Sequence, residues 1–90
     1  MDEESYNNLV KGDYVLYARV LPNVNYYQIE DLRIVTVRDD YITGVEINTK
    51  KTYLFNKKDA LEYVFINRAE AIEYLERKKD ENGFNDNTIY

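Results

Sequence analysis

Hydrophobic and polar residues alternate along several short stretches of the chain, and this two-residue period predicts β-strands. Turn-forming residues separate the stretches, among them Pro22 and the pairs Gly12-Asp13 and Asp39-Asp40. The alternation blurs at Glu30-Asp31, which predicts a bulge near the start of the second strand. The expected strands cover residues 14–20, 28–38, 41–47, 52–55 and 63–66. A polar crossing at residues 56–61 is expected to contain one turn of 3₁₀ helix.

The spacing of apolar residues becomes helical after Asn67. The Asn67 side chain can accept a hydrogen bond from the backbone N–H of Glu70, which predicts a helix start at this point. Gly83 is suited to end the helix in a left-handed conformation. The expected apolar face consists of Ala71, Ile72 and Leu75. A helix with so narrow a face is unstable alone, so it is expected to pack on the strands.

These elements together predict a mainly β (β+α) fold, a five-stranded SH3-like small barrel followed by one C-terminal α-helix. An OB-like barrel is the competing interpretation, but its usual helix lies between the third and fourth strands, where only a short hairpin connection is available here. Ninety residues suffice for one domain with one core. The expected division is a flexible N-terminal arm at 1–10, the barrel at 11–66, the packed helix at 67–82 and a flexible tail at 83–90.

Charge and composition disfavour several classes of function. Twelve basic and seventeen acidic residues leave a net charge of −5, which opposes general binding to phosphate backbones. The chain has no cysteine for a disulfide framework. Its acidic N-terminal stretch and the lack of a long apolar run predict a cytoplasmic protein without membrane contact.

An enzyme needs a nucleophile, a tunable acid or base, or a metal site. The chain has no histidine, no cysteine and a single serine, Ser5, so the usual pairs of nucleophile and base are absent. Asp80, Asn82 and Asp86 resemble the ligands of a calcium loop but lack the closing glutamate. The sequence therefore predicts a protein that is not an enzyme and that has neither a cofactor nor a metal site.

The ten tyrosines exceed what so small a barrel can enclose. Tyrosine left at a surface suits contacts with other proteins. The expected protein-binding residues are Tyr17, Tyr26, Tyr27 and Tyr41. Tyr26 and Tyr27 come first among them because they lie at the end of an expected loop, where an aromatic ring has less structural reason to be. The alternative is that these rings only cover the ends of the barrel.

The only basic concentration surrounds the expected fourth strand. It consists of Lys50, Lys51, Lys57 and Lys58, with Tyr53 between them. Cations beside aromatic rings bind single-stranded nucleic acids, so a nucleic-acid-binding face is a second interpretation. The net charge disfavours it, and lysines at a sheet edge also protect against aggregation.

Three segments resemble a group of small, uncharacterised proteins common in phages and prophages of Firmicutes: KGDYVLYARVLP, YQIEDLRIVTVRDDYITGVE and TYLFNKKDALEYVFINRAEAIEYL. The shared positions are Gly12-Asp13, Val64-Phe65, Arg68, Glu70-Ala71 and Leu75. The resemblance implies an SH3-like barrel with a C-terminal helix, a phage or prophage origin and a setting in the host cytoplasm.

The expected function is that of a non-catalytic binding protein that engages an unidentified host or phage protein. Inhibition in anti-defence or host takeover is one expected role, and mimicry of nucleic acid by the acidic surface is another. The alternatives are a nucleic-acid-binding accessory protein that uses the Lys50–Lys58 face, and an assembly component that self-associates through a sheet edge. The sequence leaves the oligomeric state open.

Overall fold

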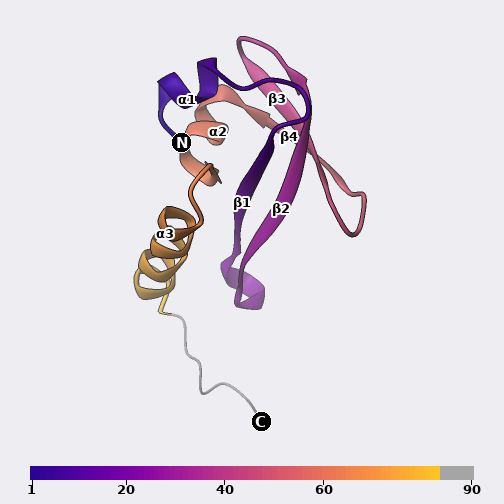
Figure 1. The fold of residues 1–90 in the computed structure, drawn as a ribbon. Coiled ribbons are helices and arrows are strands. Elements are labelled where there is room, and N and C mark those ends of the chain that lie inside the picture. Colours follow the sequence, from indigo (N-terminus) through magenta and orange to yellow (C-terminus); the bar gives the residue numbers. More distant parts are fainter. Residues whose placement is uncertain (84–90) are drawn as a thin grey trace.

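Five strands form one antiparallel sheet in the computed structural model, which describes residues 1–83 (Figure 1). The strands are β1 (Tyr14–Leu21), β2 (Tyr26–Val37), β3 (Tyr41–Glu46), β4 (Thr52–Asn56) and β5 (Val64–Phe65). Their order across the sheet is β4-β3-β2-β1-β5. The helices are α1 (Glu3–Asn7), α2 (Lys57–Tyr63) and α3 (Arg68–Glu81), and a 3₁₀ turn, η1 (Pro22–Val24), joins β1 to β2.

The prediction of a small domain with five antiparallel strands and a C-terminal helix is confirmed, but the sheet does not close into a barrel. β5 contains two residues and pairs with β1 only through Leu16↔Phe65 and Tyr17↔Val64. β4 pairs with β3, so β4 and β5 form the two edges of the sheet. From Ala18 onward, β1 therefore has a strand partner on one side only.

The bulge in β2 lies away from its expected position. Glu30 and Asp31 pair regularly with β1, and the irregularity falls between Ile34 and Thr36, opposite β3. Regular pairing with β1 extends to Leu21↔Tyr26, because η1 and the left-handed backbone of Asn25 (φ 57°) reverse the chain without an extra residue in the ladder.

The sheet separates two hydrophobic clusters, where the sequence predicted one core. The larger cluster lies on what we call the inner face, and it contains Tyr6, Leu9, Val15, Leu32, Ile34, Ile42, Phe55, Ala60 and Val64. The smaller lies under α3 on the outer face, and it contains Ala18, Tyr27, Tyr74 and Leu75. Side chains alternate along β1, so this strand contributes Val15 to one cluster and Ala18 to the other.

Residues 1–10 are not the expected flexible arm, because they pack against the domain. Asp2 caps α1 by accepting a hydrogen bond from the backbone N–H of Ser5. The Tyr6 side chain is 2% exposed, and its hydroxyl donates to the carbonyl oxygen of Arg38 over 2.9 Å. The segment carries too few apolar residues for a periodic pattern, so no local signal predicted that one tyrosine ring would anchor it.

The crossing between β4 and β5 is an α-helix, α2, and not the expected 3₁₀ turn. Asn56 caps α2 by accepting a hydrogen bond from the backbone N–H of Asp59 over 2.8 Å. Ala60 is fully buried against the inner cluster. The cap and the tertiary contact together stabilise a helix too short to persist alone.

Both expected ends of α3 are confirmed. Asn67 accepts a hydrogen bond from the backbone N–H of Glu70 over 3.2 Å, and Gly83 has a φ of 68°. The predicted apolar face of α3 is wrong at one position, because Ile72 is 46% exposed while Tyr74 is buried. The helix is therefore rotated from its expected orientation, and its buried residues are Ala71, Tyr74 and Leu75. The rest of the expected tail at 83–90 lies outside the described residues.

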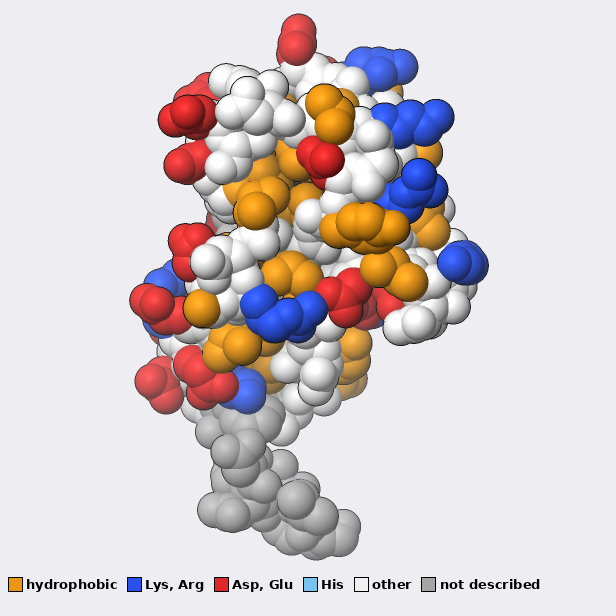
Figure 2. All heavy atoms as spheres, viewed as in Figure 1, with side chains coloured by type: hydrophobic (Ala, Val, Ile, Leu, Met, Phe, Trp, Pro, Cys, Tyr) orange, Lys and Arg blue, Asp and Glu red, His pale blue; other side chains and the backbone are white. Residues whose placement is uncertain are grey.

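Charged side chains are unevenly distributed over the surface. In Figure 2, Asp and Glu gather mainly along the side where α1 and α3 lie, and Lys and Arg mainly along the side of β3 and β4. Hydrophobic side chains lie between the two zones. Although the net charge of the chain is −5, positive charge is therefore concentrated locally on the side of β3 and β4.

The rotation of α3 predicts unequal costs for two neighbouring substitutions. Leu75→Ala should lower the free energy of unfolding by about 2–5 kcal/mol, because it leaves a cavity under the helix. Ile72→Ala should lower it by about 1 kcal/mol or less, because much of that side chain is already in water. Urea unfolding measures both values. Equal losses would contradict the observed orientation of the helix.

The packing of the N-terminal segment predicts that Tyr6→Ala lowers the free energy of unfolding by about 3–5 kcal/mol, by analogy with other buried aromatic residues. Asn7→Ala, at the exposed neighbouring position in α1, is the control and should change it by about 0.5 kcal/mol or less. A flexible arm would make both substitutions neutral in the same urea experiment.

Candidate functional site

The long strands β1 and β2 continue past the rest of the sheet as a two-stranded ribbon. Residues 26–31 of β2 pair with β1 but have no partner in β3. The inner face of this ribbon meets the end of β4. The side chains that gather there are Tyr17, Arg19, Tyr26, Glu30, Lys51 and Tyr53, which we call the tyrosine–arginine cluster.

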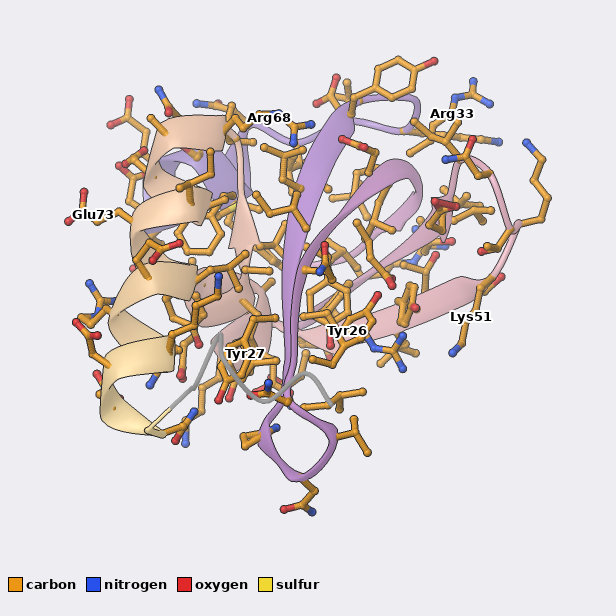
Figure 3. The ribbon with its side chains drawn as sticks, turned by 90° about the horizontal axis from the view of Figure 1, so that it is seen from below. Tyr26, Tyr27, Arg33, Lys51, Arg68 and Glu73 are labelled. Atoms are coloured by element: carbon orange, nitrogen blue, oxygen red, sulfur yellow. The ribbon has the colours of Figure 1, made fainter. Side chains whose placement is uncertain are left out.

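Strand alternation and register bring these side chains together. Tyr17 and Arg19 are two positions apart on β1, so they lie on one face, and Glu30 stands opposite Tyr17 in the ladder. Tyr26 and Tyr27 lie on opposite faces of the ribbon. Figure 3 shows Tyr26 on the side toward Lys51 and Tyr27 on the side toward α3.

The aromatic part of the cluster continues the inner core. The Tyr17 ring makes edge-to-face contacts with Tyr53, at a centroid distance of 5.1 Å, and with Phe55, at 4.8 Å. Such contacts stabilise ring pairs by about 0.5–1.5 kcal/mol beyond the burial of area. Tyr17 and Tyr53 are only partly buried, so their rings pack against the inner core on one side and remain accessible to solvent on the other.

The charged part of the cluster is centred on Arg19. Its Nη1 lies 3.3 Å from Oε1 of Glu30, in an ion pair whose side chains are 24% and 13% exposed. Its guanidinium carbon lies 5.5 Å from the ring centroid of Tyr26 and 5.7 Å from that of Tyr53. The Nζ of Lys51 lies 5.5 Å from the ring centroid of Tyr53 as well. The arginine is thereby fixed between two rings by contacts that favour a planar cation.

Glu30 has an unused acceptor at the centre of the cluster. Its Oε1 accepts a hydrogen bond from the Tyr26 hydroxyl over 3.1 Å, whereas its Oε2 is buried and has no hydrogen-bond partner among the described residues. Burial and the nearby Glu30 carboxylate raise the pKa of Tyr53 to about 12, although the Tyr53 hydroxyl does not meet hydrogen-bond geometry with Oε2. A buried carboxylate oxygen without a donor is costly, so an incoming donor would be favoured here.

Two of the four predicted protein-binding tyrosines, Tyr17 and Tyr26, belong to the cluster. Tyr27 does not, because it is 5% exposed and packs under α3, so its prediction as an exposed contact residue is wrong. β2 begins at Tyr26 where the sequence predicted a loop, and strand alternation then turns Tyr27 toward the helix. Tyr41 alternates with the buried Ile42 and lies on the outer face, away from the cluster.

The predicted face Lys50–Lys58 does not form one continuous surface. Lys50 and Lys51 lie at the β3–β4 hairpin, while Lys57 and Lys58 lie beyond the other end of β4. The five residues of β4 lie between the pairs, so Lys51 and Lys57 are six residue steps apart, about 20 Å at roughly 3.3 Å per residue. The Nζ of Lys57 also lies 2.7 Å from a carboxylate oxygen of Glu3 in α1. Only Lys51 and Tyr53 keep the expected proximity of cation and ring.

A second surface lies on the outer face, where α3 leaves the upper part of the sheet uncovered. Tyr14 is 67% exposed, Val35 42% and Ile47 40%. They surround a hollow of about 360 Å³, which we call the outer hollow, lined by Tyr14, Arg33, Val35, Val45, Glu46, Ile47 and Lys50. Contiguous exposed apolar residues of this kind mark interaction surfaces.

The carboxylate of Glu46 does not neutralise the outer hollow. It accepts hydrogen bonds from the backbone N–H groups of Asn48 and Thr49 in the hairpin. The N–H of Thr49 is the main reason that the pKa of Glu46 is lowered. The groups left to a ligand are therefore apolar side chains and the cations of Arg33 and Lys50.

Sequence reasoning missed Arg19, Glu30 and the outer hollow. The two charged residues lie on one face with Tyr17 once the register is known, but the alternation within each strand does not give the register. The hollow depends on how much of the outer face α3 covers, and no local pattern contains that information.

Comparison with protein-family models, curated proteins and solved structures finds no match to this chain. Within residues 1–83, no helix is long and apolar enough to cross a membrane. The same residues contain no group of three or more acidic side chains placed to hold a metal ion.

The surroundings of Tyr53 predict a measurable titration. Its pKa should be about 12 in the folded protein, against about 10 for an unfolded chain. Because the folded state holds the proton more tightly, this residue's contribution to stability is lost as the pH rises from about 10 to 12. The ¹³Cζ resonance of Tyr53 reports the pKa directly.

Glu30→Gln should lower the pKa of Tyr53, because it removes the neighbouring negative charge and leaves burial as the main cause of the shift. Glu76→Gln, at an exposed position on α3, is the matched control and should leave that pKa unchanged. A Tyr53 pKa that is insensitive to Glu30→Gln would show that the carboxylate does not face the ring.

Proposed function

We propose that this chain is a non-catalytic binding protein whose tyrosine–arginine cluster receives a segment of a partner protein. The observation that carries the proposal is the buried Oε2 of Glu30, which has no hydrogen-bond donor within residues 1–83 and lies in a cluster whose rings are only partly buried. A lysine or arginine side chain, or a backbone N–H, of the partner would supply that donor. The surrounding rings would cover the apolar part of the segment.

The composition and rigidity of the cluster support this function. Tyrosine and arginine are the residues that most often dominate the energetics of protein interfaces. Arg19 is already held by an ion pair and two rings, and Tyr17 is held by two ring contacts, so binding would cost little side-chain entropy. A preorganised aromatic surface can bind a segment with few new constraints.

We propose further that the architecture is SH3-like. The strand order and the placement of a short helix between β4 and β5 support this reading, while the incomplete closure leaves the cluster open at the ribbon. The phage or prophage origin and the roles in anti-defence, host takeover or nucleic-acid mimicry stay predictions. The four lysines are separated along the fold, so they give little support to the nucleic-acid-binding alternative. The tyrosine–arginine cluster gives more support to protein binding.

The proposal predicts that a random library of displayed peptides yields binders whose contact site is the cluster. Chemical-shift mapping with a selected peptide should move the resonances of Tyr17, Tyr26 and Tyr53. Tyr26→Ala should weaken binding of that peptide about tenfold or more, because it removes a rim ring and one partner of Glu30. Isothermal titration calorimetry measures the change.

Tyr41→Ala is the matched control, since Tyr41 is also partly exposed but lies on the outer face. It should leave the affinity within about twofold, a difference of roughly 0.4 kcal/mol. Selection that yields no binder, or a binder whose affinity depends on Tyr41 and not on Tyr26, would refute the proposed site.

A further inference from the structure

The outer hollow offers an apolar surface with a positive rim. Its exposed apolar members are Tyr14, Val35 and Ile47, and its cations are Arg33 and Lys50. The Arg33 side chain is exposed, and its guanidinium has no ion-pair partner within 4.0 Å among the described residues. A ligand for this surface would be apolar at its centre and acidic at its border.

The outward face of α3 has the complementary character. Ile72 is 46% exposed on this face, and Glu73 and Glu76 stand beside it. Glu76 is 3.5 Å from the Nζ of Lys79, whereas Glu73 has no ion-pair partner within 4.0 Å in residues 1–83. One large apolar side chain beside a glutamate that has no ion-pair partner in residues 1–83 fits the chemistry that the outer hollow requires.

The two surfaces cannot meet within one molecule. In Figure 3, Arg33 and Glu73 lie on opposite sides of the domain, with the β1–β2 ribbon between them. A contact between different surfaces of identical chains is heterologous, and it leaves one free surface at each end of any pair. Such a contact continues into a longer assembly or closes into a ring.

We propose that the outer hollow binds the outward face of α3 from a second copy of this chain. In this contact Ile72 of one copy packs against the apolar residues of the hollow, and Glu73 pairs with Arg33. The exposed apolar residues of both surfaces become buried, and the two unpaired charges neutralise each other. The tyrosine–arginine cluster takes no part, so this self-association is independent of the proposed binding function.

Light scattering of the full chain over a range of concentrations tests the proposal. The mean mass should rise with concentration beyond two copies, because each pair retains one free copy of each surface until a ring closes. Raising the salt concentration should reduce the mass, since screening weakens the pairing of exposed charges. A monomer at every concentration, or a mass that ends at two copies, overturns the proposal.

A charge exchange identifies the contact. Arg33→Glu and Glu73→Lys should each weaken self-association about tenfold or more, because each places like charges together. The chain that carries both substitutions should associate again. An equimolar mixture of the two single variants should also regain mass, because each offers a surface that complements the other. Failure of both the double variant and the mixture to recover overturns the contact.

Two control variants carry the same charge changes elsewhere. Lys58→Glu and Glu62→Lys alter exposed positions of α2, which belong to neither the outer hollow nor the outward face of α3. Both should associate as the unaltered chain does. If they weaken association as much as Arg33→Glu and Glu73→Lys, net charge and not the proposed contact governs the assembly, and the proposal is overturned.

Discussion

The structure depends on the burial of β1 from both faces. Val15 and Ala18 are each at most 2% exposed, yet they belong to different hydrophobic clusters. One face of the strand holds α1, α2 and the other strands together, and the other face holds α3. A strand in this position cannot slip by one residue, because a slip would exchange the side chains of the two clusters. The register of β1 against β2 is therefore strongly specified.

That register also produces the candidate site. Once Tyr17 stands opposite Glu30, Arg19 must project from the same face, beside the carboxylate and the ring of Tyr53. The cluster is thus the polar continuation of the inner core, at the place where β2 has lost its partner β3. Partial burial strengthens its electrostatics, because fewer water molecules screen the ion pair. In the part of the chain that the structure describes, the Oε2 of Glu30 is buried there without a donor.

The two faces of the sheet consequently offer different chemistry. The inner face ends in rings and paired charges that are held in place, which suits recognition of a segment by preformed contacts. The outer face ends in exposed apolar residues and in two cations, Arg33 and Lys50, that have no ion-pair partner in residues 1–83, which suits a larger complementary surface. α3 accounts for this difference, because it covers the lower outer face and presents its own acidic side to solvent.

The sequence by itself determined the elements whose cause is local. Alternation placed the strands to within a few residues, and the side chain of Asn67 specified the start of α3. It did not determine which residues meet. The burial of Tyr6 and Tyr27, the exposure of Ile72 and the pairing of Arg19 with Glu30 were settled by tertiary structure alone. Local patterns arise from one strand or one helix turn, whereas these features depend on the register between strands and on the rotation of α3 against them, which only contacts between distant segments fix.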